Sequence, residues 1–545
     1  MSDKRITRRQ IIVRGGFAGA GAMGLNAFLA ACGGGGDASK KDGTPATGDP
    51  AGDVARGGAI IWALSADPTF MIPYGATLTE TRQATEFVYQ SLLQWDKDLK
   101  IIPALAESYE TPDDSTYVFK LRQGVTFHDG TPFTAKDVVY SAELWLDPPP
   151  PGTPDTVSQV PGIDKVEAVD DQTVKITMKT PDARLPGFLA WGRYSSIVPD
   201  GMYDKIDPRT KANGSGPFSL VEFRQNDRIT YKRNAKYWDT ELPGVDDLTL
   251  RVLPDEQGRL AALKSGEIHG CTVSSDIAET LKSDPNLEVL KGNITAHREI
   301  QFTIKKGEKK PWHDVKVRQA INHAINRQDV IDRVFGGNAD WSSVIPPGYG
   351  DFPVSQEDLK SNWQAYDVDK ARTLMSEAGF ADGFKVELQV FTATADTQQI
   401  AQIVQQQLKD IKVDLKLRPL EVAVFAKNNG AGDFDMQLTT RGMRGDVAGY
   451  TSDFDPEAPI YEIWFPGLDA DPQIGELIKQ GFTTLDQAAR LPIYKQIQEL
   501  VLPAALHIPI CNPYKFQAMS KKVKGMYVGY TDFNPGLVEA RMAKA

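Results

Sequence analysis

The stretch LRQGVTFHDGTPFTAKDV, residues 121–138, carries three local structural signals in a short span. It follows STYVFK (115–120), a run rich in β-branched and aromatic residues that favours a strand. Asp129-Gly130 is a turn dipeptide. Thr134 is typical of a helix N-cap, and Asp137, three residues on, can reach back to it. We therefore predict a strand, a turn and a helix over residues 115–146.

The same alternation of strands and helices continues on both sides of this stretch. Hairpins are expected at Asp170-Asp171 and near Asn226-Asp227, because each pair separates two strand-like runs. The apolar spacing of residues 313–337 predicts one long helix closed by Gly336. Residues 385–420 are predicted as strand, helix and strand, and the sequence shows no internal repeat. This pattern predicts a fold of α/β layers.

Length and charge restrict the class of protein. A chain of 545 residues is expected to fold as two or three packed units. Its hydrophobic content of 41% and charged content of 24% are ordinary for a globular protein. Without residues 1–31, it has 56 Lys and Arg against 71 Asp and Glu, a net charge of −15. An acidic surface argues against nucleic acid and against anionic lipid as partners.

The N-terminal stretch RRQIIVRGGFAGAGAMGLNAFLAAC, residues 8–32, predicts export rather than cofactor binding. Gly19, Gly21 and Gly24 spell the G-x-G-x-x-G dinucleotide motif, but no strand precedes them and no acidic ribose partner follows. A basic segment, a mildly apolar segment and LAAC instead follow the order of a secretory signal, predicted for residues 1–31. Arg8-Arg9 indicates a twin-arginine signal. We predict no cofactor.

The end of that stretch and the segment after it predict an anchored protein. Leu29 to Cys32 resemble a lipobox, which implies cleavage before Cys32 and lipid on its sulfur. Residues 32–55 contain almost no side chains that can pack, so we expect a flexible tether with a reach of roughly 25 Å. The folded body would begin near Arg56.

From Leu121 to Val138 the chain carries nearly all of the pattern L-R-x-G-V-x-F-H-D-G-x-P-x-T-A-x-D-V. Here it resembles the peptide- and nickel-type extracellular solute-binding proteins of ABC importers, bacterial family 5, cluster C. The resemblance extends over about residues 56–540 through collinear matches: GSGPFSLVEF (214–223), RNAKYW (233–238), LKSGEIHG (263–270), DVKVRQAINHAINRQDVI (314–331), IPPGYG (345–350), DVDKARTLMSEAGF (367–380) and GDFDMQL (432–438).

The resemblance implies a two-lobed α/β periplasmic-binding-protein fold with two hinge crossovers and an extra subdomain in lobe I. Lobe I would comprise residues 56–285 and 506–545, and lobe II residues 286–505. The expected function is to capture peptides or a similar small solute between lobes that close by hinge motion. A separate ABC permease and ATPase would then import the solute. We expect a monomer on the periplasmic or cell-surface side of a membrane, held only by its lipid.

The segment 441–459 is the predicted ligand-binding region, by resemblance to peptide-binding relatives. These carry a W-x-x-D-Y-x-D-P-like pattern, whose first acid pairs with the ammonium of a peptide. This sequence departs from that pattern, and either Asp446 or Asp453 could take the role, with Asp453 closer in spacing. Arg441 and Arg444 suggest an alternative, because paired guanidinium groups suit a carboxylate or phosphate on the ligand.

Further candidates are four aromatic residues that could form ligand walls: Tyr74, Trp191, Tyr450 and Trp464. Cys271 and Cys511 fall near the expected crossovers and are a candidate disulfide. The histidines lack the spacing of metal ligands, so no metal site is predicted. No hydrolase or nucleotide-binding motif is present, so we expect no enzyme. The alternatives are a non-peptide ligand (an opine, glutathione-like compound, oligosaccharide or metal chelate) or, less favoured, an extracytoplasmic hydrolase.

Overall fold

The computed structural model describes residues 54–74, 79–146, 160–207, 209–292, 296–305, 308–392, 395–466, 468, 471–529 and 536–544. The predicted signal peptide with Arg8 and Arg9, the lipidation site Cys32 and the tether up to residue 53 lie outside these residues.

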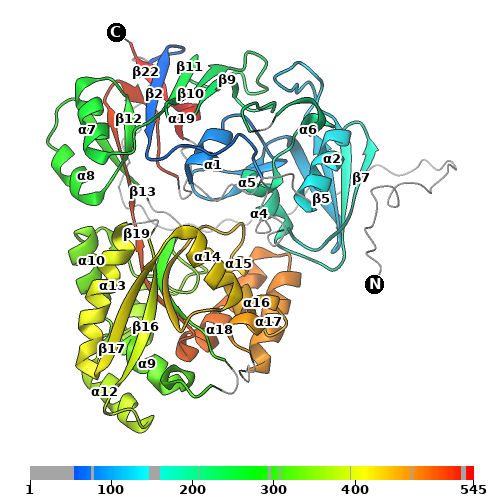
Figure 1. The fold of residues 1–545 in the computed structure, drawn as a ribbon. Helices are drawn as coiled ribbons and strands as arrows, with labels where there is room; N and C mark the ends of the chain where they lie inside the picture. Colours follow the sequence, from blue (N-terminus) through cyan, green and yellow to red (C-terminus); the bar gives the residue numbers. More distant parts are fainter. Residues whose placement is uncertain are drawn as a thin grey trace, which may run out of the picture. The chain divides into compact units, whose positions relative to one another are not determined.

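The first lobe is built on a seven-stranded sheet in the order β13-β20-β12-β2-β11-β10-β9 (Figure 1). Its strands are β2 (Ala59–Leu64), β9 (Phe218–Arg224), β10 (Arg228–Arg233), β11 (Asp247–Val252), β12 (Gly270–Val273), β13 (Leu287–Gly292) and β20 (Lys515–Ser520). Strand β2 runs parallel to both of its neighbours, β11 and β12, whereas β20 runs antiparallel to both β12 and β13. The predicted turn near Asn226-Asp227 is confirmed between β9 and β10.

The second lobe is built on a six-stranded sheet in the order β15-β19-β14-β18-β16-β17. Its strands are β14 (His297–Phe302), β15 (Ala339–Asp340), β16 (Phe384–Phe391), β17 (Val413–Leu420), β18 (Met436–Arg441) and β19 (His507–Pro513). Strands β16 and β17 are parallel and are joined by α13 (Ala395–Leu408), which confirms the predicted strand–helix–strand unit. Both lobes therefore combine parallel pairs with antiparallel neighbours, in a mixed α/β fold.

The stretch around residues 121–138 belongs to an extra subdomain in the first lobe. A four-stranded sheet in the order β5-β6-β8-β7 comprises β5 (Ala106–Asp113), β6 (Thr116–Leu121), β7 (Ile163–Asp170) and β8 (Thr173–Met178). Helix α2 (Ala135–Leu146) follows the turn, where Gly130 has a left-handed φ of 88°. Asp137 Oδ2 accepts the Thr134 amide at 2.7 Å, which confirms the predicted cap. The hairpin at Asp170-Asp171 is also confirmed.

The remaining elements cover these sheets or form small ones. Two small sheets comprise β3 (Leu93–Trp95) with β4 (Ile101–Pro103), and β22 (Arg541–Ala543) between β1 (Val54–Ala55) and β21 (Val523–Lys524). The further helices of the first lobe are α1 (Thr79–Thr85), α4 (Leu185–Leu189), α5 (Gly192–Ser195), α6 (Met202–Lys205), α7 (Glu256–Ser265), α8 (Ser275–Leu281) and α19 (Gly536–Glu539). Those of the second are α9 (Val315–Ala324), α10 (Arg327–Phe335), α11 (Gln356–Asp358), α12 (Val368–Glu377), α14 (Val422–Ala431), α15 (Ala448–Thr451), α16 (Pro459–Trp464), α17 (Pro472–Thr483) and α18 (Gln487–Ala504).

The single long helix predicted over residues 313–337 is wrong, because two helices occupy this stretch. Helix α9 ends at Ala324, and Ile325 takes an extended conformation. The side chain of Asn326 then accepts the Asp329 amide and starts α10, whose C-cap is Gly336, as predicted. The apolar spacing continues across both helices, so it did not reveal the N-cap between them.

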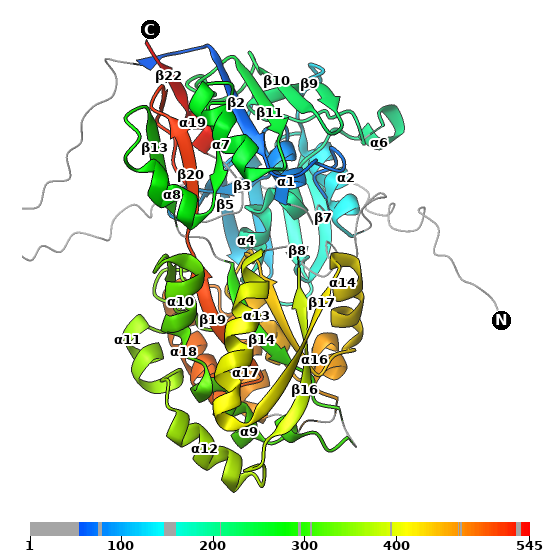
Figure 2. The same cartoon turned by 60° about the vertical axis from the view of Figure 1, so that its left-hand side comes forward.

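The chain changes from one sheet to the other at two places. It passes to the second sheet between Gly292 and His297, and it returns at Tyr514, between β19 and β20 (Figure 2). The predicted lobe boundaries, at 285/286 and 505/506, lie upstream of these changes. The difference arises because β13 still pairs in the first sheet and β19 still pairs in the second.

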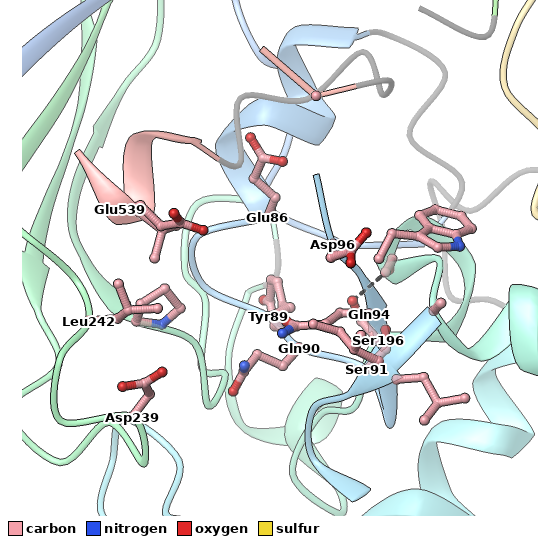
Figure 3. A pocket seen from close by; sticks show the side chains of 18 of the residues that line it. Glu86, Tyr89, Gln90, Ser91, Gln94, Asp96, Ser196, Asp239, Leu242 and Glu539 are labelled. Atoms are coloured by element: carbon pink, nitrogen blue, oxygen red, sulfur yellow. Dashed lines mark hydrogen bonds between the residues drawn. The ribbon is translucent and has the colours of Figure 1, made fainter. Parts of the chain in front are cut away.

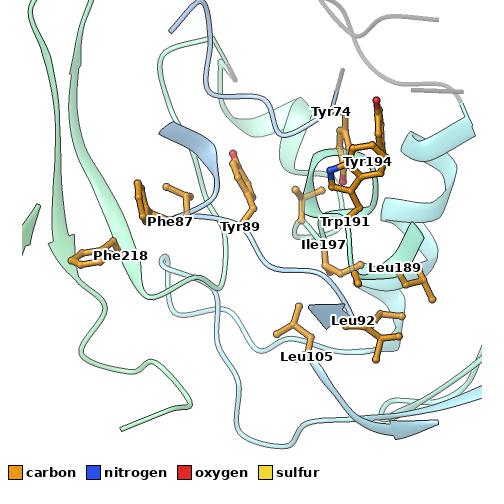
Figure 4. Packing of buried hydrophobic residues seen from close by; sticks show 14 of the residues in the cluster. Tyr74, Phe87, Tyr89, Leu92, Leu105, Leu189, Trp191, Tyr194, Ile197 and Phe218 are labelled. Carbon is orange, nitrogen blue, oxygen red and sulfur yellow. The ribbon is translucent and has the colours of Figure 1, made fainter. Parts of the chain in front are cut away.

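Each lobe has its own hydrophobic cores. The largest core of the first lobe contains Phe87, Tyr89 and Leu92, and it also buries Tyr74 completely (Figure 4). The Tyr74 hydroxyl donates to the Ser196 carbonyl at 2.7 Å, so this predicted ligand wall is a core residue with a satisfied polar atom.

The two cysteines do not form the candidate disulfide, since both are free buried thiols. Cys271 lies opposite Ala518 on β20, whereas Cys511 lies on β19, seven residues earlier along an almost continuous strand. At about 3.3 Å per residue, this places the thiols far beyond the roughly 7 Å Cα separation that a bridge allows. Burial raises the pKa of each thiol to about 12, so neither is a reactive thiolate at neutral pH.

Candidate ligand-binding site

A small cavity of about 90 Å³ lies where the two lobes meet. The first lobe contributes the segment around α4 and α5, and the second contributes the loop that follows β18. The lining residues are Arg184, Phe188, Trp191, Arg444, Gly445, Asp446, Gly449, Ser452 and Asp453. The cavity thus brings together Trp191, Arg444, Asp446 and Asp453 from the predicted ligand-binding residues.

Close backbone contact holds the lobes together beside this cavity. The Ala183 amide donates to the Phe482 carbonyl at 2.7 Å. A Cβ on Gly187, in α4, would lie only 2.1 Å from the Gly445 carbonyl oxygen. Glycine at position 187 therefore allows α4 to approach the loop of the second lobe more closely than any other residue would.

Asp446, one of the two predicted ammonium acceptors, is fully engaged within the protein. Its two oxygens bind the Arg490 guanidinium at 2.5 and 2.8 Å, and Oδ1 also accepts the Ala448 amide. The Arg490 side chain is fully buried, and it also donates to the Gly481 carbonyl and to the Tyr494 hydroxyl. A ligand ammonium group at Asp446 would have to compete with this bidentate ion pair.

Asp453, the other predicted acceptor, is only half engaged. Its Oδ2 lies 2.7 Å from Arg441 Nη2, and the side chain is 14% exposed. Its Oδ1 has no partner among the described residues. Asp453 therefore offers the cavity a carboxylate oxygen that Asp446 does not offer.

Arg441 does not line the cavity and belongs instead to a buried polar cluster behind Asp453. The cluster comprises His297 and Glu299 on β14, Arg441 at the end of β18 and His507 at the start of β19. Glu299 Oε2 lies 3.0 Å from His297 Nε2, and Oε1 lies 3.7 Å from Arg441 Nη1. Burial opposes a charge on Glu299, but His507, His297 and Arg441 outweigh it and lower the pKa of this carboxyl group. Glu299 is therefore an anion.

Trp191 is the predicted aromatic residue that reaches the cavity. Its ring packs edge-on against Tyr194, with centroids 4.6 Å apart, and a Cβ on Gly445 would lie 3.1 Å from it. Its indole N–H is buried and finds no acceptor among the described residues. A ligand carbonyl or carboxylate would satisfy this donor.

The remaining aromatic candidates of the second lobe are core residues that line neither of the two described cavities. Tyr450 is fully buried and donates to the Gly442 carbonyl at 3.2 Å. Burial raises its pKa to about 12. Trp464 donates its indole N–H to the Asn429 carbonyl at 2.8 Å. Both side chains stabilise the lobe, so the prediction of direct ligand walls is not supported for them.

A larger cavity of about 500 Å³ lies in the first lobe (Figure 3). Tyr89, Trp95, Tyr237, Trp238 and Tyr527 give it aromatic walls. Further lining residues are the acids Glu86, Asp96, Asp239 and Glu539 and the polar residues Gln90, Ser91, Gln94 and Ser196. Ala190 and Gly192, the chain neighbours of Trp191, also line it, so Trp191 lies at the boundary of the two cavities. Its volume is in the range of small-molecule sites.

The residues that the structure describes contain no group of three or more His, Cys, Asp and Glu side chains placed to hold a metal ion. None of their helices is long and apolar enough to span a membrane.

Residues 100–464 match the family of bacterial extracellular solute-binding proteins, family 5. The chain belongs to this family. It is 30% identical over 481 residues to the glutathione-binding protein GsiB of Pectobacterium atrosepticum, covering 86% of this chain and 91% of that protein. The GsiB protein of Escherichia coli K12 is 29% identical over 486 residues, covering 86% and 92%.

Two solved structures of periplasmic binding proteins show the same two-lobed fold. AgaA of A. tumefaciens R10, in complex with agropinic acid, is 28% identical with a TM-score of 0.76. DppA of Helicobacter pylori, an ABC transporter-associated protein in complex with the peptide STSA, is 26% identical with a TM-score of 0.75. Each alignment covers 90% of this chain and 99% of the other. As a family 5 protein, the chain belongs to a family of extracellular solute-binding proteins.

Three charged residues at or behind the cavity between the lobes were not predicted from the sequence. Arg490 lies on α18, 44 residues after its partner Asp446, and Glu299 lies far upstream on β14. Arg184, which lines the cavity, follows its partner Asp182 by two residues and contacts it at 2.6 Å. A charged residue among buried residues is a signal that could have identified Glu299. It lies in the strand HREIQF, whose residues are all buried, and a buried charge needs a partner.

Histidine burial predicts that the stability of this family 5 protein depends on pH. The chain has six histidines, and burial lowers the pKa of each: His128, His269, His297, His313, His323 and His507. Below about pH 6.5 the unfolded chain therefore takes up protons that the folded protein does not. The free energy of unfolding should fall as the pH drops from about 7.5 to 5.5, by at most about 1.4 kcal/mol per pH unit per histidine.

Urea unfolding across this pH range measures the effect. His507→Gln should flatten the profile more than its control His313→Gln, because His507 is fully buried and His313 is not. Stability that stays constant or rises toward pH 5.5 would contradict the prediction.

Proposed function

We propose that this protein is the lipid-anchored substrate-binding component of an ABC importer. It captures a short peptide, or a peptide-like solute such as glutathione, between its two lobes and delivers it to a permease and ATPase. The observation that carries the ligand class is the half-engaged carboxylate of Asp453 on the cavity between the lobes. A partly buried anion of this kind favours a ligand with a complementary cation, here a free ammonium group.

The sizes of the two cavities support a ligand that occupies both of them, with one end in each. A cavity of about 90 Å³ accommodates one end of a peptide, such as its ammonium group, but not the whole molecule. The larger cavity, of about 500 Å³, begins on the other side of Trp191 and could receive the remainder. The buried indole N–H of Trp191 could then donate to a carbonyl oxygen of the ligand.

The relatives support the same class without restricting it to one compound. GsiB proteins bind glutathione, and the DppA structure contains a tetrapeptide. The AgaA structure contains agropinic acid, which keeps an opine-like acid as the second candidate. Arg444 lines the cavity and would contact the carboxylate of such a ligand. Arg441 is a weaker candidate for this role, because it already binds Asp453 behind the cavity wall.

The proposal also includes the N-terminal signal peptide, the lipidation site and the tether of this chain. Residues 1–31, with Arg8 and Arg9, would act as a twin-arginine signal peptide, and Cys32 would carry the lipid. Residues 32–55 would tether the folded body, placing it on the periplasmic or cell-surface side as a monomer. The acidic body would then depend on the lipid for membrane attachment.

The test is native mass spectrometry of the full chain purified from rich medium, followed by release of any bound compound. Titrations of the ligand-free protein with glutathione, STSA, their N-acetylated forms and agropinic acid complete it. We expect binding of a free amine and weak binding of its acetylated form. In Asp453→Asn this preference should disappear, whereas Asp455→Asn, two residues away and not on the cavity, should retain it. Binding of agropinic acid alone, unaffected by Asp453→Asn, would contradict the peptide proposal.

A further inference from the structure

Glu299 is a buried acid that takes no direct part in the proposed binding of the ligand. It is 1% exposed and does not line either of the two described cavities. Its strand, β14, lies between β18 and β19, and His297 pairs in register with Arg441. Side chains two residues apart on a strand share a face, so His297, Glu299 and Gln301 point to the same side of the sheet. Arg441 and His507 reach Glu299 from the neighbouring strands.

Both oxygens of Glu299 are held within this cluster. Oε2 lies 3.0 Å from His297 Nε2. Oε1 accepts from Gln301 Nε2 at 2.6 Å and lies 3.5 Å from His507 Nδ1 and 3.7 Å from Arg441 Nη1. The position of the carboxylate is therefore fixed by contacts from three strands.

Arg441 links this fixed carboxylate to the cavity. Its Nη1 lies 3.3 Å from His507 Nδ1 and forms an ion pair with Glu299 Oε1 at 3.7 Å, and its Nη2 lies 2.7 Å from Asp453 Oδ2 and 3.2 Å from the Gly449 carbonyl oxygen. The guanidinium is planar, so an anion on one side sets the direction of the nitrogen on the other. Arg441 thus binds one of the two carboxylate oxygens of Asp453 at the cavity wall.

The charges behind Asp453 favour an ammonium group at this carboxylate. Glu299 and Arg441 carry opposite charges that offset each other, so Arg441 does not by itself cancel the negative charge of Asp453. Replacing Glu299 with an uncharged residue would leave Arg441 to neutralise Asp453 on its own. The local attraction for a cation at the cavity would then be lost.

We propose that Glu299 is a positioning residue: through Arg441 it holds Asp453 with one carboxylate oxygen and one negative charge available to the ligand. The inference rests on the proposed function, since it concerns the same cavity. It assigns a role in ligand selection to two residues, Glu299 and Arg441, that line neither of the described cavities.

The test compares Glu299→Gln, Asp453→Asn and the double variant in the full chain. A glutamine at position 299 cannot accept hydrogen bonds at the places of both Glu299 oxygens. Its NH₂ group would replace one oxygen and face a group that now donates to that oxygen. The probes are glutathione and STSA, each with a free and an acetylated amine, and the readout is the ratio of the two dissociation constants. In Glu299→Gln this ratio should fall about tenfold, a typical coupling between neighbouring groups. The double variant should show no further fall beyond Asp453→Asn.

Two further variants separate positioning from general stability. Glu387→Gln is the matched control, because Glu387 lies on β16 of the same sheet and pairs with Arg418 at the surface. It should leave the ratio unchanged. Arg441→Lys retains the positive charge but cannot bind both acids through a planar fork, so it should also lower the ratio. It provides a second test if Glu299→Gln folds poorly.

Crystal structures of the ligand-free variants add a readout that does not depend on the probes. In Glu299→Gln we expect the Arg441 guanidinium to rotate and the Nη2–Asp453 contact to change. An unchanged contact, an unchanged binding ratio, or an additive effect in the double variant would overturn the inference. If Asp453→Asn itself retains the preference for a free amine, the proposed function fails. If only Glu299→Gln and Arg441→Lys retain it, the positioning role alone fails.

Discussion

Replacing Asp446 with alanine is expected to lower the free energy of unfolding by about 3–5 kcal/mol, the cost of leaving a buried ion without its partner. The guanidinium of Arg490 has no exposed surface and forms a bidentate pair with Asp446 at 2.5 and 2.8 Å. Burial opposes the charge on Arg490, but Asp446 outweighs it and raises the pKa of the guanidinium. A guanidinium does not lose its proton in a protein, so in the variant Arg490 would stay charged, and its remaining partners among the described residues would be Gly481, Tyr494 and, at 3.5 Å, Gln487.

Urea unfolding at neutral pH measures this loss. The matched control is Asp369→Ala, which removes an acid paired with Arg372 at 2.9 Å on an exposed helix surface. An exposed pair of this kind contributes about 0–1 kcal/mol. If Asp446→Ala is no more destabilising than this control, the ion pair does not hold the loop. If it instead removes the preference for free amines without changing stability, Asp446 rather than Asp453 binds the ammonium group.

The second large effect is expected from Gly187→Ala. The new Cβ would lie 2.1 Å from the Gly445 carbonyl oxygen, less than any van der Waals contact, so α4 and the facing loop must separate. Overpacking of this kind typically costs 1–3 kcal/mol, which corresponds to a roughly 5- to 150-fold weaker Kd if the contact is needed to enclose the ligand. Alanine is the better helix former, so the change should not destabilise α4 itself.

Calorimetric titration of the co-purified ligand, with thermal unfolding as a second measurement, tests this effect. Gly442→Ala is the control, because a Cβ at position 442, in the same loop as Gly445, would meet no atom within 4 Å. It should bind normally. Wild-type affinity in Gly187→Ala would show that the observed approach of α4 to Gly445 is not required in the ligand-bound protein.

Much of the fold could be predicted because its signals are local. The Thr134–Asp137 cap, the Asp170-Asp171 hairpin and the 385–420 strand–helix–strand unit each depend on residues within a few positions of one another. The break between α9 and α10 was missed for the same reason, since periodic apolar residues continue past the capping side chain of Asn326. The predicted lobe boundaries lie upstream of the changes of sheet, because the sequence of a strand does not specify the strand with which it pairs.

The site could be predicted only in part, because its geometry depends on distant partners. The sequence predicted Asp446 and Asp453 as site residues. It could not show that Arg490 binds both carboxylate oxygens of Asp446, whereas Arg441 binds one oxygen of Asp453. Arg441 was predicted as a ligand contact because its planar guanidinium can bind carboxylates. The same property makes it a good counter-ion for acids within the protein. Apolar surroundings do not separate core aromatics such as Trp464 from cavity aromatics such as Trp191.

The position of β20 has a consequence for biosynthesis. This strand lies between β12 and β13 in the first sheet, and β19 lies between β14 and β15 in the second. Both sheets therefore lack an interior strand until residues 507–520 have left the ribosome. At about 5–20 residues per second, that takes roughly 25–100 s. Neither lobe can reach its final structure during most of translation, so exposed strand edges on β13 and β14 have to be kept from aggregating for all of that time.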